Sequence, residues 1–251
     1  MPVPQFDLWW TRYSELANDP VLDEYRQIIN DCERAKETRF HFAKDRLCYL
    51  VTRALVRTVL SRYLAVAPAE LQFEQNGYGR PELAPPRPLS FNLSHTDGLI
   101  VLAVSHCGDV GVDVENMLAR EAALEVAPRF FAPAEVSALA ALPPDAQPER
   151  FFEYWTFKES YIKARGMGLS LPLDQFAFHY PSRDTVRLVT ERSIGDDSAR
   201  WSFLQLRPRA DFILALCAPR FEVSPRLSIR DVKPLLSEEI VSAEIVRRSV
   251  D

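Results

Sequence analysis

Two carboxylates lie two residues apart in GVDVEN, residues 111–116. Valines alternate with them, so the segment predicts a β-strand that carries Asp113 and Glu115 on one face. Two carboxylates held side by side repel each other unless a cation or a proton lies between them. Mg²⁺ suits such a pair, because it is a hard ion that prefers oxygen ligands. Taken alone, the segment fits an acidic edge strand in contact with solvent equally well.

A further acid lies in WTFKESYIKARGMGLSLPL, residues 155–173. On a helix Glu159 and Lys163 are one turn apart, and an exposed pair of this kind stabilises a helix by only ~0.2–0.5 kcal/mol. The neighbouring aromatic residues indicate a partly buried helix instead: Phe151, Phe152, Tyr154, Phe157 and Tyr161. A charge pair buried there costs desolvation unless it has a further partner, such as a metal ion or a phosphate.

Two more segments carry groups that could bind phosphate. In FNLSHTDG, residues 91–98, Ser94 and His95 end a predicted strand, where hydroxyl, imidazole and backbone N–H could contact phosphate oxygens. A Ser-His-Asp hydrolase is the rival interpretation, but adjacent strand residues point to opposite sides and no GxSxG segment occurs. In NGYGRP, Arg80 follows a glycine turn, which is either a phosphate cradle or an ordinary hairpin. Walker A and GxGxxG motifs are absent, so neither a P-loop nor a Rossmann site is predicted.

Helices and strands must position these groups. Apolar residues recur at steps of three and four over residues 45–64, which predicts a helix. Residues 150–165 predict a second helix that ends at the glycines beyond it, and residues 237–247 a short closing helix. Apolar or alternating runs predict strands at residues 89–93, 99–105, 109–115, 175–180, 185–190, 201–206 and 212–217. Strands and helices mix without strict alternation, so the fold class is α+β, with a candidate boundary near residue 110.

The composition is that of a soluble globular protein. A chain of 251 residues with 47% hydrophobic and 26% charged residues fits one large domain or two small ones. No apolar stretch approaches the ~20 residues of a membrane-spanning helix, and the amino terminus lacks the basic region of a secretory signal. Four cysteines without CxxC spacing suit free thiols in the cytoplasm. A net charge of −5 argues against general nucleic-acid binding.

Together the motifs resemble those of the Sfp-type 4′-phosphopantetheinyl transferases. The resemblance covers residues 35–175 and lies in the segments Gly79-Arg80-Pro81, FNLSH, GVDVE, WTFKESYIKA and GLSLPL. It implies two similar α+β halves with pseudo-twofold symmetry, residues 1–110 and 111–251, and a cleft for coenzyme A between them. It also implies transfer of the 4′-phosphopantetheine arm of coenzyme A to a serine of an apo acyl or peptidyl carrier protein, which releases adenosine 3′,5′-bisphosphate.

The resemblance assigns roles to the acids and lysines of the two long motifs. Asp113, Glu115 and Glu159 would hold Mg²⁺ against the pyrophosphate of coenzyme A. Lys163 would contact the phosphate and offset charge in the transition state, assisted by Lys158. Glu159 is the first candidate for the general base that deprotonates the acceptor serine. A metal-bound water relayed by Glu115 is the competing candidate, and this second acid resembles the branch that serves secondary-metabolism carriers.

Further residues would bind the anionic parts of coenzyme A. By resemblance, Ser94 and His95 would contact the pyrophosphate or the 3′-phosphate, and Arg80 would face the same anion. Lys44 matches a basic position that contacts the 3′-phosphate. The carrier would dock on a basic or apolar patch beside the cleft, for which the candidates are Arg53 and Arg57 of the helix over residues 45–64 and the segment after the proline loop at Leu142.

Other functions would use the same residues. A Mg²⁺-dependent hydrolase of nucleotide pyrophosphate bonds needs the same acids and phosphate ligands, with water as the acceptor. A module that binds coenzyme A or a carrier without turnover is the non-enzymatic alternative, although every expected acid and lysine is present. The transferase interpretation predicts a monomer, because both walls of the implied cleft come from one chain. The composition described above predicts that the protein lies in the cytoplasm and binds neither a membrane nor nucleic acid.

Overall fold

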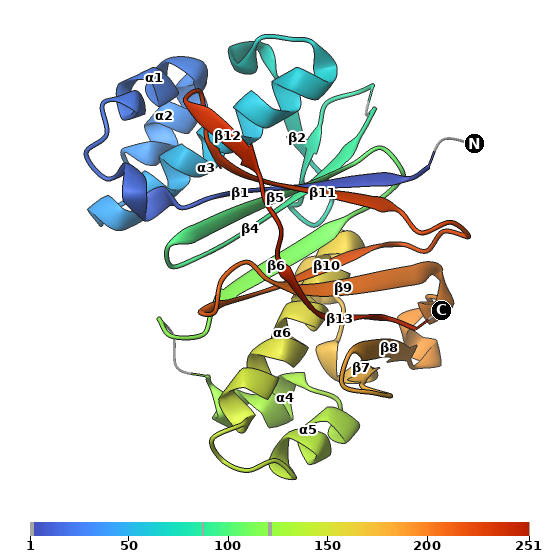
Figure 1. Cartoon of the computed structure of the whole chain (residues 1–251). Helices are drawn as coiled ribbons and strands as arrows, with labels where there is room; N and C mark the ends of the chain where they lie inside the picture. Colours follow the sequence, from blue (N-terminus) through green and yellow to red (C-terminus); the bar gives the residue numbers. More distant parts are fainter. Residues whose placement is uncertain (1–2, 87, 120–121, 251) are drawn as a thin grey trace.

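Two β-sheets face each other across the middle of the molecule, and helices cover the outer side of each sheet (Figure 1). The computed structural model describes residues 3–86, 88–119 and 122–250. Six α-helices and two main sheets lie in this part of the chain, so the predicted α+β class is confirmed. None of its helices combines the length and the apolar character needed to cross a membrane.

The first sheet has the strand order β12-β11-β1-β5-β4. Its strands are β1 (Gln5–Thr11), β4 (Ser90–Thr96), β5 (Leu99–Ser105), β11 (Arg226–Lys233) and β12 (Ser237–Ile240). The long helix α3 packs on its outer side, and two shorter helices pack against α3. These helices are α1 (Val21–Ile28), α2 (Asp31–Glu37) and α3 (Ala43–Leu64), and a hairpin follows them with β2 (Phe73–Gln75) and β3 (Pro81–Leu83).

The second sheet has the strand order β6-β10-β9-β13-β8-β7. Its strands are β6 (Gly111–Asn116), β7 (Phe176–His179), β8 (Thr185–Thr190), β9 (Trp201–Arg207), β10 (Phe212–Pro219) and β13 (Glu244–Ser249). The helix α6 packs its aromatic residues on the outer side of this sheet. The helices of this half are α4 (Ala127–Phe130), α5 (Pro133–Ala140) and α6 (Gln147–Ala164).

Each central strand divides its side chains between two cores. In β5, Ile100, Leu102 and Val104 pack with α3, while Leu99 and Val101 point to the second sheet. The same alternation in β6 and β10 fills the space between the sheets with apolar side chains. Burial on both faces explains why β5 and β10 form near-continuous apolar runs in the sequence, whereas β6 carries Asp113 and Glu115 on its other face. The strands predicted between residues 89 and 217 and the two long helices are confirmed.

The predicted closing helix over residues 237–247 is wrong. These residues form two strands instead, and the chain passes from one sheet to the other between them. β12 pairs antiparallel with β11, and β13 lies between β9 and β8. Such a short segment has no periodicity that separates helix from strand, and free backbone groups on β11 and β9 decide the outcome.

The last part of the chain therefore returns to the first half. After β10 ends at Pro219, β11 pairs parallel with β1, so the first sheet contains strands from both ends of the sequence. Arg226–Ile240 belongs to the first sheet and Glu244–Ser249 to the second. A division at residue 110 thus separates the two helical layers but does not separate the two sheets.

Candidate active site

The edge strands β4 and β6 meet where the two sheets adjoin, and side chains of β4 join them. The backbone N–H of Val112 donates to Asn92 Oδ1 at 2.9 Å, and that of Val114 donates to Ser94 Oγ at 3.3 Å. Farther along, the N–H of Asn116 donates to Thr96 Oγ1 at 3.1 Å. Because alternate residues of a strand share one face, β4 presents these three polar groups in a row to β6.

This row explains why Ser94 is buried. Sequence reasoning identified Ser94 but missed its neighbours Asn92 and Thr96, although the alternation of polar residues in FNLSHT was the available signal. Ser94 Oγ also donates to Asp113 Oδ1 at 2.8 Å, so it connects the first half of the chain to the first acid of β6. His95, on the opposite face of the strand, is exposed.

Helix α6 brings Lys163 to the same point. Its ammonium lies 2.6 Å from Asp113 Oδ1 and donates to Ser94 Oγ at 3.1 Å and to the carbonyl of Val112 at 3.2 Å. The helix reaches the strand this closely because residue 111 is glycine: a Cβ there would lie 2.0 Å from the carbonyl oxygen of Ser160. The small residue therefore sets the distance between the lysine and the carboxylate.

Glu159 lies one turn of α6 before Lys163 and faces the same carboxylate. Burial and the negative charge of Asp113 raise the pKa of Glu159 to about 7, while the positive charge of Lys163 acts in the opposite direction. Asp113 Oδ2 is buried and has no hydrogen-bond partner among the residues that the structure describes. Two facing carboxylates with one free buried oxygen have the donor chemistry that a divalent cation requires.

The three predicted metal ligands do not form a closed cluster as they stand. Among the residues that the structure describes, no group of three or more His, Cys, Asp or Glu side chains is arranged to hold a metal ion. The ammonium of Lys163 lies beside Asp113 and neutralises its charge. The third acid, Glu115, lies farther along β6 and accepts a hydrogen bond from Thr96 Oγ1 at 3.5 Å.

Glu115 opens onto a cavity of about 420 Å³ between the two halves. Lys44, His95, Asp97 and Tyr13 line the same cavity. Lys44, in the first turn of α3, forms an ion pair of 2.7 Å with Asp97 in the turn after β4. Desolvation and then the positive charge of Lys163 lower the pKa of the His95 imidazole. The cavity thus combines a cation, an imidazole and a carboxylate beside the Lys163–Asp113 pair.

Lys158 lies elsewhere, which differs from the expected contact with coenzyme A. Its side chain is fully buried, and its ammonium lies 2.7 Å from Glu135 in α5. It also donates to the carbonyls of Leu173 and Phe176, each at 2.7 Å. The turn of the helix points Lys158 into the aromatic core while Glu159 points to β6, and the lysine therefore fixes the loop after α6 to the helix.

Arg80 was expected to contact a phosphate of coenzyme A, but it lies between the two halves of the molecule and binds protein groups. Instead of facing an anion, its guanidinium donates to the carbonyls of Ala164 at 3.2 Å and Val110 at 3.4 Å. It lies 3.5 Å from Asp109, and only 9% of its side chain is exposed. Since Ala164 ends α6 and Arg80 precedes β3, this side chain holds the hairpin of the first half against the second half.

The two arginines predicted for carrier docking are not available for it. Arg57 is completely buried and its Nε donates to Glu33 at 2.7 Å, while Arg53 donates to the other oxygen of Glu33 at 2.6 Å. The arginine-bearing face of α3 packs on α2 and on Phe73 rather than facing solvent. These two side chains therefore stabilise the first half of the molecule.

A lysine, facing carboxylates and a cleft between two α+β halves have the chemistry of an enzyme that transfers a phosphate-linked group. Two family models match consecutive parts of this chain. Residues 18–107 match "4′-phosphopantetheinyl transferase, N-terminal", and residues 109–217 match the "4′-phosphopantetheinyl transferase superfamily".

Individual proteins from distant organisms are similar over most of the chain. It is 30% identical to the 4′-phosphopantetheinyl transferase HetI of Nostoc sp., over 82% of this chain and 84% of HetI. It is 35% identical to the 4′-phosphopantetheinyl transferase Sfp of Bacillus subtilis, over 68% of this chain and 76% of Sfp. A phosphopantetheinyl transferase of Thraustochytrium sp. is 32% identical over 70% of this chain and 66% of its own length. The chain belongs to the 4′-phosphopantetheinyl transferase superfamily and is a transferase enzyme.

Proposed function

We propose that this transferase moves the 4′-phosphopantetheine arm of coenzyme A to the serine of an apo acyl or peptidyl carrier protein, in a Mg²⁺-dependent reaction that releases adenosine 3′,5′-bisphosphate. The observation that carries the proposal is the Lys163–Asp113 pair beside the unpartnered oxygen of Asp113. This arrangement supplies a cation for a phosphate and an anionic oxygen for a metal ion.

The metal ion would be held by Asp113 and Glu159, with Glu115 as the third acid. When bound, Mg²⁺ supplies positive charge that neutralises the pyrophosphate and stabilises the departing phosphate. Lys163, which now contacts Asp113, Ser94 and the carbonyl of Val112, would be placed to donate to a phosphate oxygen beside Asp113. Lys44 and His95 face the same cavity and would bind the outer phosphate groups of coenzyme A.

The transfer exchanges one phosphorus–oxygen bond for another. The serine oxygen forms a bond to the phosphorus that carries the pantetheine arm, and the bond from this phosphorus to the bridging oxygen breaks. The electron pair leaves with adenosine 3′,5′-bisphosphate. The serine proton would go to Glu159, which is the weaker base the more closely it holds the metal ion; the raised pKa of about 7 belongs to the metal-free protein. Glu115 acting through a water molecule is the alternative base.

Intact-mass spectrometry of an apo carrier protein tests the proposal. After incubation with this enzyme, coenzyme A and Mg²⁺, the carrier should gain one phosphopantetheine, about 340 Da from its formula, at a serine. EDTA should prevent the gain. Formation of adenosine 3′,5′-bisphosphate at the same rate without a carrier would contradict the proposal and favour the pyrophosphate hydrolase. Intact coenzyme A and an unmodified carrier would favour a binding module.

We also propose that the enzyme works as a cytoplasmic monomer. The cavity that contains Lys44 and Glu115 is formed within a single chain, so a second subunit is not needed to complete it. All four cysteines are free thiols, and Cys48 and Cys217 are buried, which suits a reducing compartment. Sedimentation velocity would test the monomer, and a mass of two chains would contradict it.

A further inference from the structure

Positive charge is scarce in the cavity beside Glu115, although this cavity is proposed to bind phosphate groups. Among the described residues that line it, Lys44 is the only lysine or arginine, whereas Asp45, Asp97 and Glu115 are acids. Lys44 already has a partner, because its Nζ lies 2.7 Å from Asp97 Oδ2. A phosphate that binds Lys44 in this cavity must therefore compete with a carboxylate of the protein itself.

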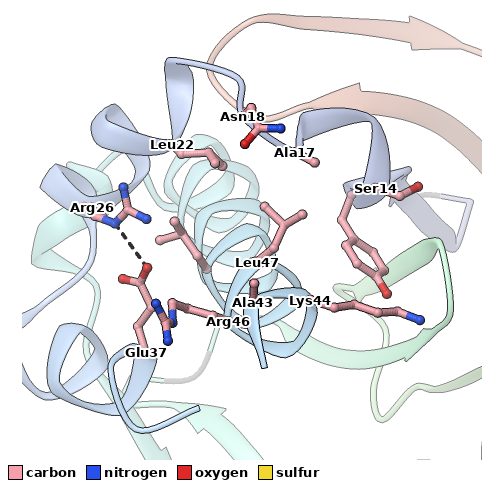
Figure 2. Close-up of a pocket in the computed structure, with 12 residues that line it drawn as sticks. Ser14, Ala17, Asn18, Leu22, Arg26, Glu37, Ala43, Lys44, Arg46 and Leu47 are labelled. Carbon is pink, nitrogen blue, oxygen red and sulfur yellow. Dashed lines mark hydrogen bonds and ion pairs between the residues drawn. The ribbon is translucent and has the colours of Figure 1, made fainter. Parts of the chain in front are cut away.

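Lys44 reaches Asp97 from the first turn of α3. Figure 2 shows the side chain of Lys44 extending from the start of this helix, away from Leu47. Glu37, at the opposite side of the same view, is paired with Arg26 at 3.1 Å. The side chain of Lys44 is 58% exposed, so its ammonium can exchange Asp97 for another anion without moving a core residue.

The backbone that carries the carboxylate of Asp97 is fixed. Asp97 begins the two-residue turn between β4 and β5, since Thr96 and Leu99 on either side of the turn still pair with each other. Gly98 completes the turn with a φ of +89°, which glycine adopts without strain. Asn116 of β6 donates from Nδ2 to the carbonyl of Asp97 at 3.0 Å. A negative charge therefore remains beside any phosphate that takes the lysine.

The 3′-phosphate occurs in both nucleotides of the proposed reaction, because coenzyme A carries it in and adenosine 3′,5′-bisphosphate carries it out. A cation that binds this group equally in both molecules lowers the KM for coenzyme A but does not raise the rate of the chemical step. It also slows the departure of the product. A carboxylate that competes for the same cation weakens both complexes and takes the lysine back when the product leaves.

We propose that Asp97 competes with the 3′-phosphate for Lys44 and thereby limits the affinity for coenzyme A and speeds the release of adenosine 3′,5′-bisphosphate. This inference rests on the proposed function, since it concerns the regulation of that same site. The ion pair is open to solvent on both sides, so its effect on affinity is a few-fold. A ligand without a 3′-phosphate leaves the pair intact and is not subject to the competition.

Asp97→Asn tests the competition, because the amide keeps the size of the side chain and removes its charge. Calorimetry in the presence of Mg²⁺ should show that D97N lowers the Kd of coenzyme A and of adenosine 3′,5′-bisphosphate about five-fold. Stopped-flow displacement should show that the product dissociates more slowly by a similar factor. The Kd of 3′-dephospho-coenzyme A should change by less than about two-fold. D184N removes the same charge from an exposed turn of the second half and should leave all these values unchanged.

A double-mutant cycle with Lys44→Met separates competition for the lysine from simple repulsion of the ligand. In the K44M background, D97N should change the Kd of adenosine 3′,5′-bisphosphate by less than about two-fold, because no ammonium is left to compete for. An effect as large as that in the wild type would show that Asp97 only repels the phosphate, and this would overturn the inference. Both side chains are exposed, so melting temperatures should show that every variant is folded.

The direction of the D97N effect decides the outcome. Weaker binding of the nucleotides would mean that Asp97 supports Lys44 in the phosphate site. Weaker or unchanged binding, equal tightening of 3′-dephospho-coenzyme A, or no binding of any nucleotide to the wild type would each overturn the inference. Because these measurements need no carrier protein, they are independent of transfer. If D97N tightens the two 3′-phosphates but no carrier gains phosphopantetheine, the proposed function fails and this inference stands.

Discussion

The ammonium of Lys163 lies 2.6 Å from Oδ1 of Asp113, so a residue of α6 and a residue of β6 share one charge pair at the meeting point of the two sheets. The other oxygen of Asp113 is buried and, in the described part of the chain, has no hydrogen-bond partner. Lys163 therefore provides a partner for only one of the two carboxylate oxygens of Asp113. A metal ion bound at the second oxygen would weaken the attraction of Asp113 for Lys163. The first two predictions rest on this weakening.

Asp113→Ala should lower the transfer rate at least about a hundred-fold, because it removes the proposed metal ligand and leaves Lys163 without its partner. The fold should persist, since Ser94 Oγ still accepts from the N–H of Val114 at 3.3 Å. Single-turnover rates with an apo carrier would measure the effect, and circular dichroism would check the fold. Turnover like that of the wild type would remove Asp113 from the metal assignment.

Lys163→Ala should lower kcat more than it weakens the binding of coenzyme A, because the lysine is expected to gain its phosphate contacts mainly in the transition state. We expect a loss of about a hundred-fold in kcat and less than about five-fold in the dissociation constant of coenzyme A. Calorimetry and steady-state kinetics would give the two values. Equal losses in both would make Lys163 a simple binding residue.

The pKa of Glu159 makes the stability of the metal-free protein depend on pH. Its pKa is raised from 4.5 to about 7 in the folded state, so the folded protein binds more protons than the unfolded chain between these values. The free energy of unfolding should therefore be highest below pH ~4.5 with respect to this group and fall by up to about 3 kcal/mol as the pH rises to ~7.

Urea unfolding at pH 5 and pH 8 in EDTA would measure this difference. Glu159→Gln should lose most of it, because an amide does not titrate. Added Mg²⁺ should restore stability at pH 8 in the wild type if Glu159 is a ligand. The same loss of stability in wild type and E159Q would show that other groups cause the pH dependence.

Gly111→Ala should destabilise the protein severely, by several kcal/mol. The new Cβ would lie 2.0 Å from the carbonyl oxygen of Ser160 and 2.4 Å from the backbone nitrogen of Ala164, so α6 would have to move away from β6. Gly77→Ala is the matched control, because a Cβ at Gly77 meets nothing within 4 Å. Thermal unfolding of the two variants would compare them, and similar melting temperatures would contradict the prediction.

Lys158→Met should cost about 3–5 kcal/mol of stability, because it leaves Glu135 as an uncompensated buried acid. The double variant K158M/E135L should recover part of the loss, since both members of the buried pair are then apolar. Chemical unfolding would measure all three proteins. A folded K158M enzyme should keep its KM for coenzyme A, and a large rise would return Lys158 to the substrate-binding residues.

The sequence predicted which residues lie together at the site more accurately than it predicted the contacts around them. Alternation in GVDVEN and helical spacing in the segment around Glu159 are local patterns, and the structure brings Asp113, Glu159 and Lys163 together as these patterns suggest. The buried role of Lys158 could not be predicted, because its partner Glu135 lies 23 positions earlier and no local pattern connects them. Helix periodicity places Lys158 and Glu159 about 100° apart around the helix. It does not show which of the two side chains faces the core.

Long-range pairing explains the other differences. The arginines of α3 follow a regular spacing, which predicts a common face but not that Glu33 of α2 covers it. The strands β12 and β13 depend on free edges of sheets formed by distant residues, so the sequence of residues 237–247 alone does not distinguish strand from helix. Contacts that join distant parts of the chain are those that a local pattern cannot show.

The return of the chain after β10 affects the order in which the protein can fold during synthesis. β1 is made more than 200 residues before its parallel partner β11, which begins at Arg226. Until then one side of β1 is an unpaired strand edge, which can pair with other chains. Val241 and Ala243 pack between the sheets and connect β12 to β13, so both sheets are completed almost together once these two strands have been made. A nascent chain stalled before residue 226 should therefore depend on chaperones and aggregate when released, whereas the finished chain should fold and unfold in one cooperative step.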